Sequence, residues 1–571
     1  MSDILNKAKL WLSAPFDVET QKEIQNLIHT DPKELKDRFY QNMEFGTGGM
    51  RGIMGAGTNR INKYTLGKNT QGLSNYLYKI YPNKQCKAAI AYDCRNNSKE
   101  FATSVAEVFA ANNVKVYLFE DLRPTPELSY AVRELGCDVG IVLTASHNPP
   151  EYNGYKVYFN DGGQIVPPQD NEIIDEINAV DFEDINFNSD DGLIEIIGKS
   201  IDDKFIDAAI KNSTAPSTTN RDKIKIVFTP LHGTAVTLVP EALIRAGFTD
   251  LHIVEEQRVP DGNFPTVESP NPEETAALKM ATDLADNIGA DIVIGTDPDC
   301  DRLGIAVRNM ENELVLLNGN QTFSILCSFL IKTWKKEGKL NGNQFVGSTI
   351  VSTPLIIKLA ESYGVETKVG LTGFKWIAKM IREAEGKQDF IGGGEESFGF
   401  MVGDFVRDKD AVSATLLACE IAADAKNNNS TIYSELLDLY REHDLFKEHL
   451  ISVVKKGIEG ANEIKQMMLD LRENPILEVD NSKVKYIFDY ENSIRKNLLT
   501  KEESTIDLPK SNVLIYETED GTRIAARPSG TEPKIKFYFS TNAPLSNIKD
   551  FNLVEAKLDD KIKRIIKELA L

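Results

Sequence analysis

The sequence predicts an α/β protein with three mixed α/β domains of related core, followed by a smaller C-terminal α+β domain. At 571 residues the chain exceeds one ordinary core, so several domains are expected. Short β-branched runs alternate with amphipathic helical segments in three successive stretches, whereas the last hundred residues favour antiparallel strands. We expect domains at residues 1–203, 204–320, 321–450 and 451–571.

The first domain follows an N-terminal helical stretch. Apolar, β-branched runs predict strands at 86–93, 114–121 and 137–146, and amphipathic segments predict helices at 98–113 and 126–136. Strands that alternate with helices in this way form βαβ units, so the sheet is expected to be mostly parallel.

The same alternation begins again twice. In the second domain, strands are expected at 223–233, 251–256 and 291–297, with a helix at 239–247. In the third, a strand at 344–351 precedes a helix at 353–364.

The last segment differs in its pattern. Residues 511–541 predict antiparallel strands around a turn at Asp520-Gly521, and 555–571 show apolar residues at helical spacing. A small sheet closed by one helix is therefore expected.

Composition excludes several classes of partner. The chain carries 65 Lys and Arg against 86 Asp and Glu, a net charge of −21, which argues against nucleic acid or an anionic membrane as partner. The N-terminus lacks a secretory pattern, and no apolar run approaches the ~18–20 residues that span a bilayer. Six scattered cysteines fit reduced thiols and a cytoplasmic location. Any anionic substrate must be held by local donors.

The strongest chemical signal is DIVIGTDPDCDRLGIAV, in which Asp297, Asp299 and Asp301 follow a strand. Alternating carboxylates at a strand end can converge on a hard cation such as Mg²⁺. An EF-hand is excluded, because Arg302 and Arg308 occupy the sixth and twelfth loop positions. A phosphatase with Asp297 as nucleophile stays open, and a solvated acidic turn is the structural alternative.

The segment AARPSGTEPKIKFY combines cations, hydroxyls and a glycine amide in one tight turn. Such a set suits a dianionic phosphate, although an ordinary Pro-Ser-Gly turn is an equal alternative for this segment alone. Its donors are Arg527, Ser529, Gly530, Thr531, Lys534 and Lys536.

Three glycine-rich segments offer further ligand groups. IGGGEESFGF places Glu395, Glu396 and Ser397 where they could bind sugar hydroxyls, or simply cap a helix. FGTGGMRG delivers Arg51, and TGFKWIAKM places Lys375 at the start of a helix. Both cations are of a type more often found on the surface than in a site.

The stretch TASHNPPEYNGYK places Ser146 at a strand end, where α/β sheets bind ligands. Pro149-Pro150 stiffens the loop, and Asn153-Gly154 is expected to turn the chain so that Lys156 returns towards Ser146. The stretch lacks the G-x-S-x-G elbow of hydrolases, so a Ser-His hydrolase pair is not supported. Ser146 with Lys156 and His147 suits covalent phosphoryl transfer, and His147 alone is more typical of a hydrogen-bonding loop residue.

In this order, the loops resemble those of the alpha-D-phosphohexomutase superfamily over essentially the whole chain. TASHNPPEYNGYK resembles its phosphoserine loop, DPDCDR its metal loop, GEESFG its sugar-binding loop and RPSGTEP its phosphate-binding loop. The GEESFG form and the length are similar to the longer, phosphoglucomutase-like branch. The resemblance implies four domains around a central cleft.

The resemblance also implies a role for each loop residue. Ser146 would carry the phosphoryl group and, with Asp297, Asp299 and Asp301, would hold one Mg²⁺ per chain. Two departures are Lys536, where some relatives have arginine, and Cys300, which is glycine in many relatives and should point away from the metal. The other residues would bind the substrate. Glu395 and Ser397 would contact sugar hydroxyls, and the reacting phosphate would be lined by Arg51, Lys156, Arg302 and Lys375. The non-transferring phosphate would be held by Arg527, Ser529, Gly530, Thr531 and Lys536.

The implied reaction is a reversible mutase that interconverts glucose 1-phosphate and glucose 6-phosphate, with glucose 1,6-bisphosphate as intermediate and activator. Lys156 with a lowered pKa is the first candidate for the base and His147 the second. The fourth domain is expected to move as a lid. A monomer or homodimer that binds only small phosphosugars is expected.

Other functions stay open at this point. Mannose or pentose phosphates could be the substrates, or the product could be a hexose bisphosphate, on the same scaffold. Outside the class, a Mg²⁺-dependent sugar phosphatase and a non-catalytic sugar-phosphate-binding protein are the alternatives.

Overall fold

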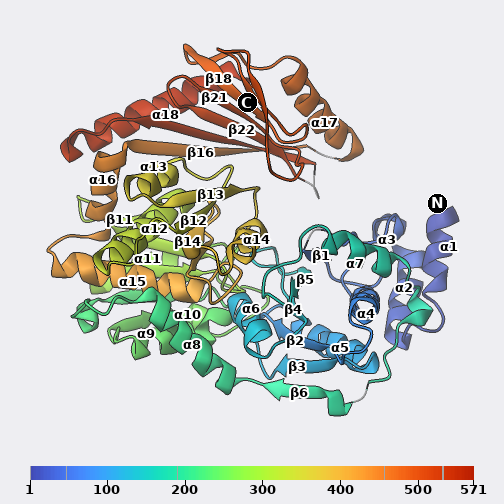
Figure 1. Ribbon diagram of the computed structural model, residues 1–571. Helices are drawn as coiled ribbons and strands as arrows, with labels where there is room; N and C mark the ends of the chain where they lie inside the picture. Colours follow the sequence, from blue (N-terminus) through green and yellow to red (C-terminus); the bar gives the residue numbers. More distant parts are fainter. Residues whose placement is uncertain (1, 47, 190, 456, 530–532) are drawn as a thin grey trace.

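The structure is a computed structural model that describes residues 2–46, 48–189, 191–455, 457–529 and 533–571. Four β-sheets follow one another along the chain, each covered by helices (Figure 1). The mixed α/β fold class and the smaller C-terminal domain are confirmed. The first three sheets lie within the first three predicted domains, while strand β16 (Leu445–Val454) crosses residue 450. The domain boundaries themselves stay predictions.

The first sheet has the strand order β1-β5-β4-β2-β3-β6. Strands β4, β2, β3 and β6 are parallel, whereas β5 runs antiparallel to both β4 and β1. The predicted strands and helices are confirmed, and a helical hairpin precedes them. The bounds are β1 Gly49–Ile53, β2 Lys87–Tyr92, β3 Lys115–Phe119, β4 Val139–Leu143, β5 Tyr152–Phe159, β6 Ile194–Ile197, α1 Ser2–Leu10, α2 Val18–Thr30, α3 Pro32–Phe39, α4 Lys63–Ile80, α5 Ser98–Ala111, α6 Thr125–Glu134 and α7 Gln169–Asn178.

The second and third sheets also have parallel centres with antiparallel strands at one edge. Their orders are β11-β10-β9-β7-β8 and β13-β12-β14-β15. The strands are β7 Ile226–Thr229, β8 Leu251–Ile253, β9 Ile292–Thr296, β10 Leu303–Arg308, β11 Leu314–Leu317, β12 Gln344–Thr349, β13 Glu366–Gly370, β14 Asp389–Gly394 and β15 Phe400–Val402. The main helices are α8 Lys199–Ser213, α9 Val239–Arg245, α11 Lys279–Ile288, α12 Gly319–Lys336, α13 Leu355–Ser362, α14 Lys375–Ala384, α15 Ala411–Asn427 and α16 Ile432–His443.

Helix α15 joins the second and third domains into one core. Its residues are buried almost throughout, and it packs against β9 and β10 of one sheet and β15 of the other. A helix that is apolar on all sides belongs in an interior. Its single buried acid, Glu420, forms an ion pair with Arg221, and 2.7 Å separates Oε2 of the glutamate from Nε of the arginine. These two domains therefore share one continuous hydrophobic cluster.

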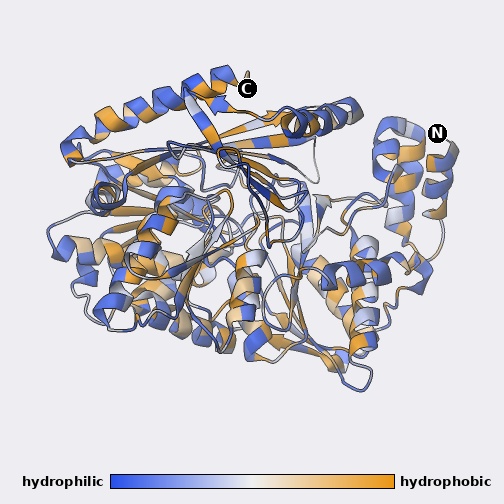
Figure 2. Ribbon diagram, turned by 45° about the horizontal axis from the view of Figure 1, so that its top comes forward, coloured by the Kyte–Doolittle hydropathy of each residue, from blue (hydrophilic) through white to orange (hydrophobic). Residues whose placement is uncertain are grey.

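The fourth sheet is antiparallel, with the order β16-β23-β22-β21-β18-β19-β20 and β17 paired to β18. Helices α17 (Gly457–Glu473) and α18 (Phe551–Glu568) cover one face, and α18 alternates hydrophobic and hydrophilic residues (Figure 2). The other face packs Ile515, Ala525 and Tyr538 against Ile350 and Val351 of the third domain. The strands after β16 are β17 Glu478–Val479, β18 Ser482–Asp489, β19 Ile494–Asn497, β20 Glu503–Thr505, β21 Leu514–Thr518, β22 Arg523–Pro528 and β23 Lys534–Ala543.

Among the helices of the described residues, none has the length and apolar character to cross a membrane.

Gly72 permits the close packing of α4 on α7. A Cβ at this position would lie 2.5 Å from the Cα of Ile177, which is backbone and cannot move aside cheaply. We predict that Gly72→Ala destabilises the first domain by ~1–3 kcal/mol, because overpacking forces the two helices apart. Thermal unfolding measures the effect. Tyr78→Ala, an exposed position on the same helix, is the control; equal shifts for both variants would contradict this packing.

Candidate active site

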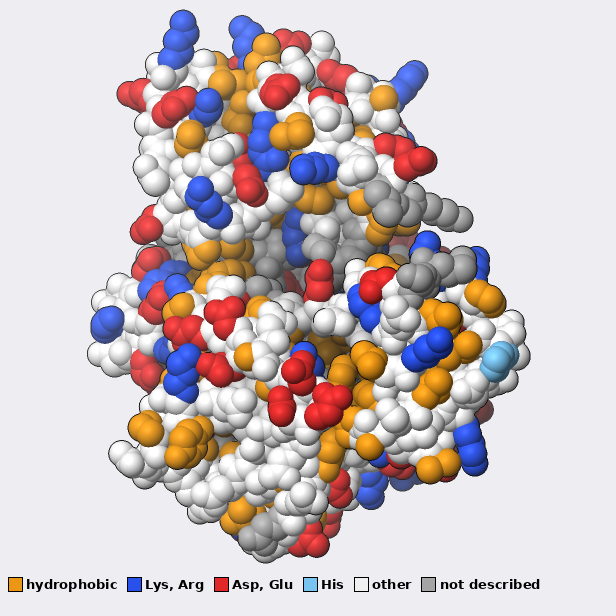
Figure 3. All heavy atoms as spheres, turned by 90° about the vertical axis from the view of Figure 1, so that its right-hand side faces the viewer, with side chains coloured by type: hydrophobic (Ala, Val, Ile, Leu, Met, Phe, Trp, Pro, Cys, Tyr) orange, Lys and Arg blue, Asp and Glu red, His pale blue; other side chains and the backbone are white. Residues whose placement is uncertain are grey.

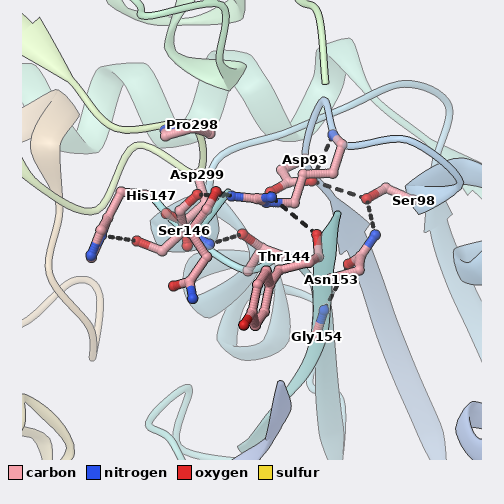
Figure 4. Close-up of polar contacts among 12 residues, drawn as sticks. Asp93, Ser98, Thr144, Ser146, His147, Asn153, Gly154, Pro298 and Asp299 are labelled. Carbon is pink, nitrogen blue, oxygen red and sulfur yellow. Dashed lines mark hydrogen bonds and ion pairs between the residues drawn. The ribbon is translucent and has the colours of Figure 1, made fainter. Parts of the chain in front are cut away.

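Ser146 lies just after β4, in the loop that leads into β5. Its hydroxyl donates a hydrogen bond to Oδ2 of Asp297 at 2.6 Å, and its Oγ lies 3.1 Å from Nδ1 of His147. Its backbone N–H donates to Oγ1 of Thr144, and its φ of 51° is in the left-handed region (Figure 4). The serine is buried, so its hydroxyl is fixed by the loop and not free to rotate in solvent.

The predicted turn at Asn153-Gly154 is wrong, because both residues lie within strand β5. The chain reverses earlier, between β4 and β5, and the two strands form an antiparallel hairpin. In this register Lys156 lies opposite Val142, next to the end of β4. Lys156 does return towards Ser146, through strand pairing and not through a second turn.

Arg95 fixes the backbone of the Ser146 loop through hydrogen bonds. Its guanidinium donates to the backbone oxygens of Ser146 at 2.6 Å, Pro149 at 2.7 Å and Tyr152 at 3.0 Å, and also to that of Asn148. The guanidinium group of arginine has five N–H donors in a fixed plane and can satisfy these four carbonyl groups, whereas a lysine ammonium group has only three donors on one atom. The loop conformation therefore depends on one buried cation.

The surroundings of Arg95 explain why it stays in place. Oδ1 of Asp93 accepts from the backbone N–H of Arg95 at 2.9 Å and from the Ser98 hydroxyl at 2.9 Å. Phe264 of the second domain lies over the guanidinium, 5.2 Å from its ring centroid. Sequence reasoning did not find Arg95; its place directly after a buried strand was the only available signal.

The three aspartates of the second domain converge as predicted. One carboxylate oxygen from each of Asp297, Asp299 and Asp301 lies within 4.8 Å of the others, and all three residues are buried. Oδ1 of Asp297 accepts the backbone N–H groups of Asp301 and Arg302, both at 3.0 Å, which fixes the turn. Cys300 has a φ of 56° and is buried in the hydrophobic core.

The donor set suits a hard divalent cation. Oδ1 of Asp299 and Oδ1 of Asp301 are buried and lack a hydrogen-bond partner among the described residues. Burial and the two neighbouring carboxylates raise the pKa of Asp297 well above its ordinary value. An oxygen-only cluster with two unsatisfied atoms is what Mg²⁺ or a similar ion requires. These residues could therefore hold a metal.

Cations from three domains surround the aspartates. Lys156 Nζ donates to Oδ2 of Asp299 at 2.7 Å and to Oδ2 of Asp301 at 3.1 Å. Lys409 of the third domain also lies 3.1 Å from Oδ2 of Asp301, and Arg302 Nε lies 3.8 Å from its Oδ1. Lys409 was missed in the sequence, where it stands in the charged run VRDKDA between a strand and an apolar helix.

The prediction that the pKa of Lys156 is lowered is wrong. Burial alone would lower it, but the carboxylates of Asp299 and Asp301 hold the pKa above its ordinary value. The same contacts lower the pKa of Asp301. Burial alone would raise that pKa, but the charges of Lys156 and Lys409 hold it below its usual range. In this arrangement Lys156 is an ammonium group and not a base.

His147 is a neutral imidazole. Burial, together with the positive charges of Arg302 and Arg51, lowers its pKa to about 2. Arg51 comes from β1, where it pairs with Gly154 of β5. The charges of both guanidinium groups therefore act on His147.

The metal loop is supported from two sides. Thr125, at the start of α6 in the first domain, donates its hydroxyl to Oδ2 of Asp299 and its N–H to the Asp299 carbonyl, both at 2.9 Å. Thr234 donates its N–H and its hydroxyl to the carbonyl of Pro298 at 2.8 and 2.9 Å. A Cβ on Gly233 would lie 2.5 Å from the Cα of Pro298, so only glycine fits there.

The loop predicted to bind sugar hydroxyls follows β14. Glu395 is buried, and burial raises its pKa to about 7, against the opposing charge of Lys409. A hydrogen bond from Ser397 also acts on Glu395. Oε2 of Glu396 accepts hydroxyl hydrogen bonds from Ser352 at 3.0 Å and from Thr349 at 3.3 Å. Glu396 is thus engaged by its own domain.

The phosphate-binding loop of the fourth domain joins β22 to β23, which place Arg527 opposite Lys536. Burial and the charges of Lys534 and Arg527 lower the pKa of Lys536, while Glu396 and Glu273 act to raise it. The Ser529 N–H donates to the Lys534 carbonyl at 2.7 Å. Gly530 and Thr531 lie outside the described residues.

Lys375 begins helix α14 in the third domain. Burial lowers its pKa to about 8, with Asp170 of the first domain acting in the other direction. The pKa of Lys375 is thus lowered, whereas that of Lys156 is raised.

A hollow lies below the fourth domain on one face of the molecule (Figure 3). Figure 3 shows it across the middle of one face, with Lys or Arg side chains inside. A cavity of about 200 Å³ lies between the third and fourth domains and is lined by Glu396, Tyr538 and Arg523 among others. Glu396 therefore faces strands β22 and β23 of the fourth domain across this cavity.

The chain belongs to the phosphoglucomutase/phosphomannomutase family. Residues 42–184, 203–311 and 318–440 match its alpha/beta/alpha domains I, II and III, respectively. The fold and the loops thus define a phosphohexomutase, an enzyme that moves a phosphoryl group within a sugar phosphate.

Particular relatives narrow this class. The chain is 38% identical over 536 residues to a phosphoglucomutase of Staphylococcus epidermidis, and the aligned residues make up 93% of this chain and 95% of the relative. It is 39% identical over 533 residues to a phosphoglucomutase of Staphylococcus aureus, covering 93% and 94%. A solved structure of a family protein from Burkholderia thailandensis shares the fold with a TM-score of 0.63 at 19% identity, covering 92% and 97%.

We predict that Arg95→Lys lowers mutase kcat/KM by ~10²-fold, because lysine cannot hold the carbonyl groups that set the position of Ser146. A coupled assay measures the rate, and circular dichroism verifies folding. Arg258→Lys, at an exposed position, is the control. Wild-type kinetics in Arg95→Lys would contradict the positioning role.

We predict that Thr125→Val weakens divalent-metal binding by ~10-fold or more, because Asp299 loses a hydrogen bond that orients it. Thr125→Ser keeps the hydroxyl and should bind almost as wild type does. Titration of Mn²⁺ followed by electron paramagnetic resonance measures the affinity without turnover. Equal affinity for the valine and serine variants would overturn the prediction.

Proposed function

We propose that the protein is a phosphoglucomutase that interconverts glucose 1-phosphate and glucose 6-phosphate through a phosphorylated Ser146. The observation that carries this proposal is the 2.6 Å contact between the Ser146 hydroxyl and Asp297 of a buried three-carboxylate cluster. Relatives named phosphoglucomutase at 38% and 39% identity support the choice of substrate.

One Mg²⁺ per chain would be held by Asp297, Asp299 and Asp301, with Ser146 beside it. When bound, the ion supplies positive charge that neutralises the phosphoryl oxygens. The unsatisfied Oδ1 atoms of Asp299 and Asp301 support this assignment. Arg51 and Arg302 add charge at the same place, and phosphoryl transfer depends mainly on such positioning and electrostatics.

In the transfer step the bond between phosphorus and Oγ of Ser146 breaks, and a bond from phosphorus to the free sugar hydroxyl forms. The hydroxyl proton passes to a base. Lys156 stays the first candidate, because the carboxylates that raise its pKa are the proposed metal ligands and would then be shared with the ion. Neutral His147, 3.1 Å from Oγ, is the second. Glucose 1,6-bisphosphate would be the intermediate.

The bisphosphate must turn around so that its other phosphate meets Ser146. Glu395 and Ser397 would hold sugar hydroxyls, while Arg527, Ser529 and Lys536, together with Gly530 and Thr531, would hold the distal phosphate. The fourth domain contacts the third largely through apolar residues such as Ile515 and Val351, which supports its movement as a lid.

The hydrogen bonds of Asp297 argue against a phosphatase that uses it as nucleophile. Oδ1 accepts two backbone N–H groups and Oδ2 accepts the Ser146 hydroxyl, so neither oxygen is free for in-line attack. Serine, not aspartate, is therefore the proposed phosphate carrier.

We predict that Ser146→Ala loses at least ~10⁴-fold in mutase kcat, with or without added glucose 1,6-bisphosphate, because no carrier remains. Ser217→Ala, at an exposed position, is the control. Release of inorganic phosphate without bisphosphate would favour a phosphatase, and binding without turnover would favour a non-catalytic protein. Retained mutase activity in Ser146→Ala would refute the proposal.

The choice of sugar rests on a few contacts. We expect kcat/KM to be higher for glucose 1-phosphate than for mannose 1-phosphate or ribose 1-phosphate, measured in one assay. A preference for mannose would make the enzyme a phosphomannomutase, and a preference for ribose a phosphopentomutase. Net formation of bisphosphate would indicate a hexose-bisphosphate synthase.

The proposal includes a cytoplasmic enzyme, and the six cysteines, which are all free, support a reducing compartment. The expectation of a monomer or homodimer stays a prediction.

A further inference from the structure

A second cavity, of about 260 Å³, lies in the first domain beside strand β1. Its walls come from the segment before β1, from α4 and from α7, which lie close together in Figure 1. The lining residues that matter here are Met43, Met50, Lys68, Asn69, Ile174 and Phe182. None of them belongs to the four loops of the proposed active site.

Two donors at this cavity lack an oxygen acceptor. Lys68 is half-buried, and burial lowers its pKa against the opposing charge of Asp181, but no carboxylate of the described residues lies within ion-pair distance of it. Its Nζ lies 5.8 Å from the ring centroid of Phe182. Nδ2 of Asn69 donates to Sδ of Met50 at 2.8 Å, and a thioether is a weak acceptor. A partly desolvated ammonium group beside an under-satisfied amide favours an anionic oxygen ligand.

The charge and size of the cavity define the ligand further. Lys68 is the only cation among the lining residues, while Glu44 stands exposed at the rim, so a monoanion suits the site better than a dianion. Ile174, Met43 and Phe182 supply apolar walls. We infer that this cavity binds a small organic carboxylate with an apolar body, its carboxylate facing Lys68 and Asn69.

Such a ligand would act on Arg51. Met50 and Arg51 are neighbours in β1, so their side chains point to opposite faces of the strand. A carboxylate that replaces Sδ of Met50 as the acceptor for Asn69 displaces the side chain of Met50, the residue next to Arg51 in the strand. Met43 packs against β1 as well, since a Cβ on Gly52 would lie 2.5 Å from its Cε. We therefore expect the bound carboxylate to lower mutase kcat, a consequence that rests on the proposed function.

Phenylacetate tests the site, with phenylacetamide as the neutral analogue of the same shape. Isothermal titration calorimetry on the full chain should give a Kd of ~1 mM or lower for phenylacetate. Lys68→Met should weaken this binding by ~10-fold or more, because a charge-assisted hydrogen bond is lost. Lys99→Met, on the exposed surface of α5, should bind as wild type does, and phenylacetamide should bind weakly to all three proteins.

Kinetics test the coupling separately. Phenylacetate should lower kcat of the wild type but not of Lys68→Met, whose basal rate should be unchanged. Absence of phenylacetate binding to the wild type, or equal binding to Lys68→Met, would overturn the site. Binding with unchanged kcat would overturn the coupling to Arg51. If the protein lacked mutase activity altogether, the calorimetric result would still decide the site.

Discussion

Mutual repulsion among three buried carboxylates is the constraint on which the rest of the active centre depends. Asp297, Asp299 and Asp301 lie too close together to stay charged unless cations neutralise them. The compensating groups come from different domains: Lys156 from the first, Arg302 from the second and Lys409 from the third. The electrostatic requirement of one short loop therefore holds three domains together around it, and the same requirement makes the loop a place for a divalent cation.

The second requirement is a serine whose position does not vary. Arg95 donates hydrogen bonds to the carbonyl groups of the loop, and Asp93 and Phe264 contact Arg95 in turn. Thr125 of the first domain donates a hydrogen bond to Asp299 of the second. Rigid support of this kind suits chemistry that depends on alignment. Within the described part of the chain, the fourth domain contributes no residue to this network and meets the third largely through apolar faces. The groups proposed for phosphoryl transfer and the domain proposed as a lid thus lie in different parts of the chain.

Local patterns predicted the fold well, because β-branched runs and amphipathic periodicity are properties of short segments. The Asp triad and Ser146 were found for the same reason, since each follows a recognisable strand. Arg95 and Lys409 were missed because their partners lie far away in sequence, and the pKa of Lys156 was misjudged because burial was considered without its acidic neighbours. The return of Lys156 was correct in outcome, although strand pairing and not Asn153-Gly154 produces it. The roles of Gly530 and Thr531 stay predictions.

The most direct test of the account is the fate of a phosphoryl group on Ser146. The protein should be incubated with glucose 1,6-bisphosphate and Mg²⁺, and its intact mass and peptide map recorded before and after a chase with glucose 1-phosphate. The account predicts one phosphoryl group, located on Ser146, that disappears in the chase as glucose 1,6-bisphosphate forms. A protein that catalyses the interconversion while Ser146 never carries phosphate, or that carries it on an aspartate, would contradict the account.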